Sequence, residues 1–129
     1  MTETNRRLFD FIAASPTPYH AVAQAAQRLE EAGFIPLSES EEWQPERGGS
    51  YYVTRGGSSL IAFTVPQEDY AGFMIAASHS DSPTFRLRQR PSVAASDMTR
   101  LSVEGYGGMI KYSWLDRPLS VAGRVTVRT

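Results

Sequence analysis

The stretch Gly72-Phe-Met-Ile-Ala-Ala-Ser-His-Ser-Asp-Ser-Pro83 decides the fold class that we expect for this chain. Its first half, Gly72 to Ser78, is a continuous apolar run without alternation, which is typical of a strand buried on both faces in the middle of a sheet. Such a sheet is covered by helices. The sequence therefore predicts an α/β fold with helices packed on a mixed β-sheet, and it places residues 79–83 at the carboxyl end of a central strand.

Two helices are expected ahead of this strand. Apolar residues at three- and four-residue spacings from Glu3 to Ala14 predict a helix with one buried stripe. Ser15-Pro-Thr-Pro18 ends that helix, because proline lacks the backbone donor and disfavours helical geometry in the residue before it. A second helix is expected from Pro18 to Ala32, with Thr17 as its N-cap and Gly33 as a left-handed cap. We expect the two helices to be antiparallel and to cover the sheet.

Further strands are indicated by runs of aromatic and β-branched residues. Tyr51–Thr54 and Ser58–Val65 flank Arg55-Gly-Gly57, which predicts a β-hairpin. The acidic stretch Ser38–Glu46 is expected to form a solvated loop or a single helical turn. The other expected strands lie at residues 34–37, 85–88, 99–106 and 121–128. A loop of small residues is expected at 91–97. The sequence stops at Thr129, which we expect to be a truncation point inside the last strand.

Size and composition exclude several functional classes. The 129 residues carry a formal net charge of -1 and are 41% hydrophobic, as expected for one folded domain. The basic residues are dispersed, so no nucleic-acid partner is expected. The absence of cysteine excludes disulfides and Cys-type zinc sites. No signal-like N-terminus or long apolar run is seen, so we expect no membrane partner and a cytoplasmic location.

The candidate chemistry follows the apolar run. Loops at the carboxyl ends of strands converge on ligands while the sheet holds them in place, so His79 could be directed into a cleft. Neutral imidazole is a good zinc ligand, and its other ring nitrogen usually donates to a carboxylate, which Asp81 could supply. Spacing alone leaves open the alternative that His79 is an ordinary loop histidine and Asp81 a turn residue before Pro83.

Other sites are less well supported. Residues 79–81 are too close in sequence to form the chain of nucleophile, base and orienting acid of a serine hydrolase, and no G-x-S-x-G motif is present. The glycine pairs lack a nucleotide-binding pattern and indicate sharp turns. His20 has no second ligand four residues on, which favours a structural role. The carboxylates that could in principle meet His79 are Asp97, Glu104 and Asp116.

Four long motifs, in order, carry a resemblance to a known family. They are Ser15-Pro-Thr-Pro-Tyr-His-Ala-Val22, Tyr51-Tyr-Val-Thr-Arg55, Ser78-His-Ser-Asp-Ser-Pro83 and the passage from Tyr106-Gly-Gly-Met-Ile-Lys-Tyr-Ser-Trp to Arg124-Val125. Together they resemble the aspartyl aminopeptidases and their bacterial relatives, which are zinc metallopeptidases with a two-metal site. The family pattern more often has Thr at the position of Ser80, a change that keeps the hydroxyl.

The resemblance implies roles for two residues. His79 would be the first zinc ligand, and Asp81 would be the carboxylate that orients it and is counted among the family's catalytic residues. Residues 1–105 would form the N-terminal part of the catalytic domain, and residues 106–129 the passage into an inserted β-rich dimerisation domain. The complete site would hold two Zn²⁺, but the other ligands and the general-base glutamate would lie after that insertion.

The function implied is that of a zinc aminopeptidase that removes N-terminal residues from peptides, acidic ones among the candidates, and forms a homo-oligomer. The chain corresponds to roughly the first third of a family member. Since a catalytic zinc normally has three protein ligands, we expect the 129-residue chain alone to be inactive. The alternatives are a non-catalytic, truncated paralogue that acts as an assembly module, and a small-ligand or peptide-binding domain that shares the scaffold.

Overall fold

The computed structural model describes residues 1–128, and the chain forms two compact units. The first unit is made of Met1–Asp81 together with the segment that begins at Ala122. The second unit is Ser82–Val121. The apolar run and the candidate site at His79 therefore both belong to the first unit.

The first unit begins with the two expected helices, α1 (Glu3–Ala13) and α2 (Pro18–Glu31). As predicted, α2 has Thr17 as its N-cap, whose Oγ1 accepts a hydrogen bond from the backbone N–H of His20 at 3.4 Å. Gly33 has a φ of 85°, the left-handed conformation that glycine adopts without steric cost. The caps read from the sequence therefore mark where this helix starts and stops.

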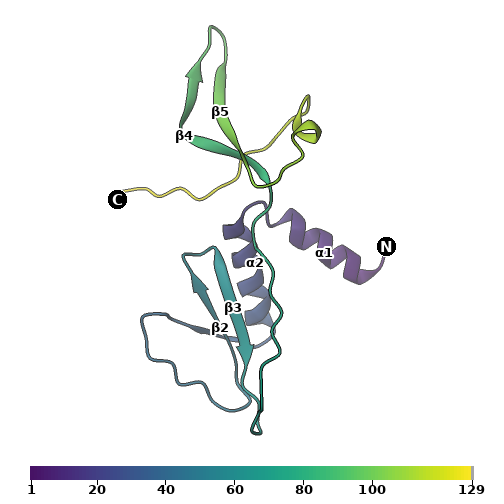
Figure 1. Ribbon diagram of the computed structural model, residues 1–129, viewed down its shortest axis with the longest axis vertical. Helices are drawn as coiled ribbons and strands as arrows, with labels where there is room; N and C mark the ends of the chain where they lie inside the picture. Colours follow the sequence, from purple (N-terminus) through teal and green to yellow (C-terminus); the bar gives the residue numbers. More distant parts are fainter. Residues whose placement is uncertain (129) are drawn as a thin grey trace. The chain divides into compact units, whose positions relative to one another are not determined.

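Only one of the two helices covers the sheet. In Figure 1, α2 lies behind β2 and β3, whereas α1 extends away from them. Arg28 on α2 joins the helices, because its Nη2 donates to the carbonyl oxygen of Arg7 at 3.1 Å and its guanidinium lies over the ring of Phe11. Leu8 and Ile12 stay more than half exposed. The expectation that both helices cover the sheet is wrong. The apolar face of a helix shows which residues favour burial, but it does not show which part of the protein will cover them.

The sheet of the first unit is mixed, as expected. It contains β1 (Ile35–Leu37), β2 (Ser50–Arg55) and β3 (Ser59–Thr64) in that order. β1 pairs with β2 in parallel, and β2 pairs with β3 in antiparallel fashion with Val53 opposite Ile61. The buried apolar residues of the described chain are Val22, Tyr51, Tyr52 and Val53, so the core lies where α2 crosses β2.

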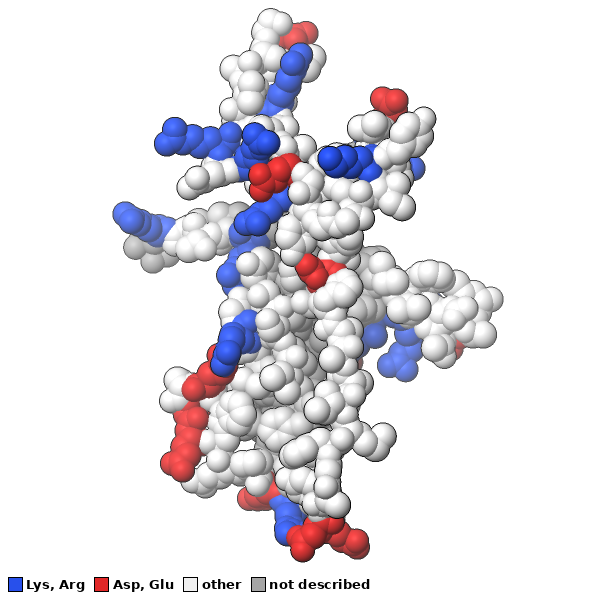
Figure 2. All heavy atoms as spheres, viewed as in Figure 1, with Lys and Arg blue, Asp and Glu red and all other residues white. Residues whose placement is uncertain are grey.

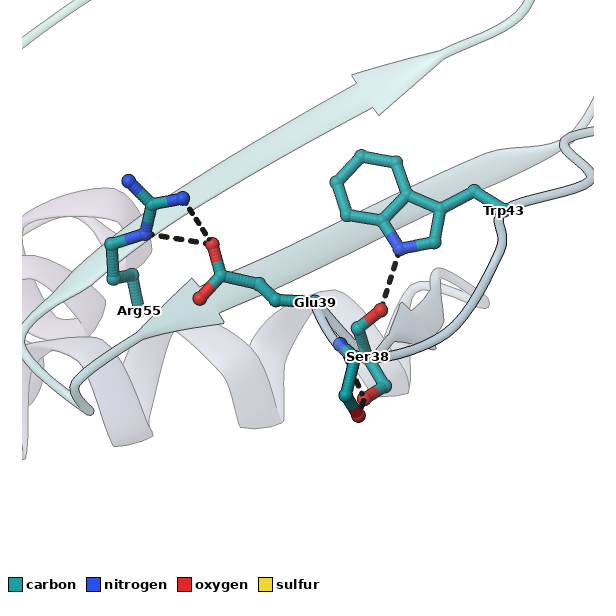
Figure 3. A network of polar contacts seen from close by, with 5 residues as sticks. Ser38, Glu39, Trp43 and Arg55 are labelled. Atoms are coloured by element: carbon teal, nitrogen blue, oxygen red, sulfur yellow. Dashed lines mark hydrogen bonds and ion pairs between the residues drawn. The ribbon is translucent and has the colours of Figure 1, made fainter.

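The acidic stretch after β1 is a loop held by side chains (Figure 3). Trp43 Nε1 donates to the carbonyl oxygen of Ser38 at 2.6 Å, and Arg55 binds the carboxylate of Glu39. The indole of Trp43 also stacks on Phe63, with ring centroids 6.4 Å apart. The loop therefore has a defined conformation in which Glu39 is already paired.

The second unit is built on a β-ribbon. β4 (Thr84–Ala94) pairs with β5 (Thr99–Tyr106) in antiparallel fashion, with a register shift between Leu87 and Ser92. A short 3-10 helix, η1 (Lys111–Trp114), follows, and Trp114 packs edge-on against Phe85. β4 is longer than predicted, and the expected loop at 91–97 shrinks to the four residues between the strands. Pro91 falls at the register shift, where its missing donor is tolerated.

Two predicted strands are absent from the described residues. Within residues 1–128, Gly72–Ser78 forms no strand and pairs with no other segment, and its Phe73, Met74 and Ile75 are 80%, 104% and 85% exposed. Residues 121–128 likewise form no strand. Both predictions are wrong for the same physical reason: apolar patterning shows that a segment favours burial, but a strand also needs a neighbour for its backbone hydrogen bonds.

The described surface carries charges of both signs. Acidic and basic side chains both occur on the face shown in Figure 2, with uncharged surface between them. Four ion pairs join arginines to carboxylates on that part of the chain that the structure describes: Arg6–Glu3, Arg47–Asp69, Arg55–Glu39 and Arg88–Glu104. Among residues 1–128, no helix is both long and apolar enough to cross a bilayer.

Candidate functional site

His79 lies in the extended segment that leads out of the apolar run, and Asp81 lies beside it. The Nδ1 atom of His79 is 2.8 Å from the backbone carbonyl oxygen of Asp81 and 3.0 Å from its Oδ1. The imidazole is 79% exposed, and the Asp81 side chain is 36% exposed. The structure thus brings together the two side chains that the sequence analysis singled out, in an open position that a ligand can reach.

The hydrogen bonds of Nδ1 define the state of the neutral ring. Both partners of Nδ1 are oxygen acceptors, so Nδ1 carries the proton and donates it. Nε2 then has a free lone pair, and the structure records no protein hydrogen bond to it within residues 1–128. A histidine whose inner nitrogen donates to a carboxylate, with the outer nitrogen free, has the arrangement that metal-ligating histidines usually have.

No complete metal site is found around this histidine. Within residues 1–128, no group of three or more His, Asp or Glu side chains is close enough to hold a metal ion. Glu104 instead pairs with Arg88 at 3.9 Å, and Asp97 accepts a hydrogen bond from Ser96 at 3.4 Å. The donor set of the described chain therefore fits one zinc ligand with its orienting carboxylate, which is fewer than the three ligands of a catalytic zinc.

The second histidine has a structural role, as the sequence indicated. The Nδ1 atom of His20 is 2.7 Å from Thr17 Oγ1, the same oxygen that caps α2. This contact ties the ring to the start of its own helix. The glycine pairs also mark turns as expected, since Gly48 and Gly107 both have positive φ.

Two long-range contacts of the first unit were not foreseen. Ser80 Oγ donates to the carbonyl oxygen of Ser58 at 2.9 Å, which links the residue between His79 and Asp81 to the turn after β2. Arg124 Nη1 donates to the carbonyl oxygen of Gly56 in the same turn, also at 2.9 Å. No sequence signal marks either contact, because each joins loop residues that are far apart in the chain.

A comparison of the sequence with models of known protein families identifies the family of this chain. The family model for aminopeptidase I zinc metalloproteases, Peptidase M18, matches residues 11–129. The chain belongs to the M18 peptidase family. The resemblance drawn from the four motifs is therefore confirmed, and M18 aminopeptidases are hydrolytic enzymes.

Two curated relatives of this M18 chain come from Pseudomonas paraeruginosa and Azotobacter vinelandii. A probable M18 family aminopeptidase 2 from Pseudomonas paraeruginosa is 48% identical over 128 residues, which cover 98% of this chain and 30% of the relative. The corresponding protein of Azotobacter vinelandii is 47% identical over 129 residues, with the same coverage. The chain therefore spans about 30% of the length of the curated relatives that it matches.

Solved structures share the fold. A dodecameric mApe1 structure from S. cerevisiae has a TM-score of 0.81 at 35% identity, over 89% of this chain and 28% of that one. The structure of a complex of Ape4 and Nbr1 has a TM-score of 0.80 at 46% identity, over 84% of this chain and 21% of that one. The α/β fold class is therefore confirmed. The division into domains at residues 105 and 106 stays a prediction.

Proposed function

We propose that this chain forms part of a zinc-dependent aminopeptidase, in which His79 is a metal ligand and Asp81 holds it in place. The observation that carries the proposal is the bonding of the His79 ring, whose Nδ1 faces two oxygen atoms of Asp81 at 2.8 and 3.0 Å. Family membership supports peptide hydrolysis as the class of reaction. The bonding of the His79 ring makes this residue suitable as a metal ligand in that reaction.

The hydrogen bonds of His79 and Asp81 suggest a role for each residue. Asp81 accepts a hydrogen bond from the Nδ1–H group, which fixes the tautomer, makes the ring more basic and leaves the lone pair of Nε2 free to bind the metal. We propose a site of two Zn²⁺ in the complete protein. When bound, zinc supplies Lewis-acid polarisation of a peptide carbonyl and a water of lowered pKa. We propose that the remaining ligands and the general base are supplied by residues outside 1–128.

The substrate we propose is a peptide with a free amino terminus, and acidic N-terminal residues are the first class to test. We further propose a cytoplasmic homo-oligomer. Family membership supports the substrate class. The dodecameric assembly of the yeast mApe1 structure supports oligomerisation.

A chimaera tests this function. The chain replaces the matching 30% of the Pseudomonas relative, a substitution that 48% identity over 128 residues makes practical. We expect hydrolysis of aspartyl- or leucyl-amide substrates, loss of at least about a thousandfold in the His79→Ala form, and full activity in a Ser96→Ala control, by analogy with the loss of other essential catalytic groups.

Two outcomes of the chimaera experiment would contradict the proposal. A folded chimaera that is inactive with every N-terminal residue would favour a non-catalytic assembly module. An active chimaera that is unaffected by His79→Ala would show that this histidine has no part in the reaction.

A further inference from the structure

We infer that Ser80 is a positioning residue, which holds the His79 imidazole by tying its segment to the turn between β2 and β3. The inference rests on the proposed metal role of His79. Ser80 lies directly between His79 and Asp81, and its Oγ donates to the carbonyl oxygen of Ser58 at 2.9 Å. This hydrogen bond joins the histidine segment to the turn between β2 and β3, across 22 residues of sequence.

The turn that receives this bond is itself held in place. Ser58 N donates to the carbonyl oxygen of Arg55 at 3.2 Å, and the two residues between them, Gly56 and Gly57, both have positive φ. Only a narrow range of backbone geometries closes a turn with that pattern, and glycine adopts it without strain. The carbonyl of Ser58 therefore has a defined direction.

The turn is also fixed to α2. Arg124 Nη1 donates to the carbonyl oxygen of Gly56 at 2.9 Å, and its guanidinium lies 4.1 Å from the centre of the Tyr19 ring at the start of α2. A Cβ on Gly57 would lie 3.2 Å from Arg124 Nη1, so the side chain packs closely against the turn. Helix, turn and the segment from Ala122 thus meet at the point to which Ser80 binds.

The consequence for His79 follows from its exposure. The imidazole is 79% exposed and has no core packing to fix it, so its direction depends on the backbone of residues 79–81. Ser80 restrains that backbone, while the Asp81 contacts restrain the ring relative to it. Removing the Ser80 hydroxyl leaves the contact between His79 and Asp81 in place but frees the segment that carries both.

The test compares Ser80→Ala with Ser80→Thr and with Ser78→Ala in the 129-residue chain. Threonine keeps the hydroxyl. Ser78 flanks His79 on the other side, and within residues 1–128 the structure records no hydrogen bond of its side chain, so it is a matched control. Long-range proton–nitrogen NMR spectra of His79 report its tautomer and mobility, and addition of ZnCl₂ with the same spectra reports its zinc affinity.

We expect Ser80→Ala to mobilise the His79 ring and to weaken its zinc binding about tenfold, as losses of partners outside the first ligand sphere do. Ser80→Thr and Ser78→Ala should match the parent chain. Ring spectra and zinc affinity unchanged in Ser80→Ala would overturn the inference. If zinc never perturbs His79 in the parent chain, the proposed metal role fails instead, while the ring mobility in Ser80→Ala still tests whether the residue positions the histidine.

Discussion

Tyr52 links strand β2 to helix α2 through its side chain. Its hydroxyl donates to Glu30 Oε1 at 2.5 Å, and the residue is 6% exposed. The hydrogen bond to Glu30, followed by burial and the negative charge of Glu30, raises the pKa of Tyr52 above its ordinary value. The neutral phenol is therefore favoured in the folded state over the unfolded one.

A raised folded-state pKa sets the direction of the pH dependence. The stabilisation is complete below the pKa of tyrosine in the unfolded chain, about 10, and is lost as pH rises through the higher pKa of the folded state. Tyr52→Phe should lower the free energy of unfolding by about 1 kcal/mol at neutral pH, and the difference should vanish in strong alkali. Urea unfolding at several pH values measures it. Tyr70→Phe, which removes an exposed hydroxyl, should have no effect, and an equal loss in both variants would contradict the account.

The candidate site was predictable in part at the residue scale. The contact of His79 with Asp81 was one of two possibilities that the two-residue spacing left open, because a short segment can fold a carboxylate back to a ring nitrogen but can equally form an ordinary turn. The bond from Ser80 to Ser58 was not, because hydrogen bonds between distant loops follow no periodicity. The metal and catalytic roles of His79 and Asp81 stay predictions.

Among the elements, the hairpin of β2 and β3 depends on its two turn glycines. Gly56 has a φ of 60°, and the nearest atom to an added Cβ is Ser58 Oγ at 3.8 Å. Gly56→Ala therefore meets no clash, and its cost is that of the left-handed backbone alone, about 1 kcal/mol. Thermal unfolding followed by circular dichroism measures that loss.

Gly72 is the matched control for this substitution. It has open space around its Cβ position and no positive φ, so Gly72→Ala should leave the unfolding temperature unchanged. Equal effects of the two substitutions would show that the turn geometry has no part in the stability of the hairpin.

Elements with local signals were predictable, and those that need a partner were not. Thr17, Pro18 and Gly33 mark the ends of α2, and the paired glycines mark the hairpin, because caps and turns are encoded in neighbouring residues. The strand predictions for Gly72–Ser78 and residues 121–128 were wrong, because a strand also needs a paired neighbour. The pattern of apolar residues carries no information on whether such a neighbour is present.

At the scale of the molecule, few apolar side chains of the described chain are buried. Val22, Tyr51, Tyr52 and Val53 are, whereas Phe73, Met74 and Ile75 face solvent. A contiguous apolar segment on the surface attracts hydrophobic dyes and other chains. The isolated 129-residue chain should therefore bind 1-anilinonaphthalene-8-sulfonate and self-associate.

Replacing Phe73, Met74 and Ile75 together by serine should remove much of the dye fluorescence and shift sedimentation toward the monomer. The unfolding free energy should change by less than about 0.5 kcal/mol, since these side chains already contact water. Val22→Ala provides the contrast, with an expected loss of about 1 to 2 kcal/mol from the core. Loss of stability in the triple variant with unchanged dye binding would mean that the segment is packed in solution.

We propose that this chain contributes one zinc ligand, His79, and that the other ligands of the site come from elsewhere. Zinc calorimetry on the purified chain and its His79→Ala variant tests this proposal, with leucyl- and aspartyl-amide hydrolysis assayed on the same samples. We predict weak zinc binding that the substitution abolishes, and no turnover. Tight zinc binding with turnover, or binding that His79→Ala leaves unchanged, would contradict it.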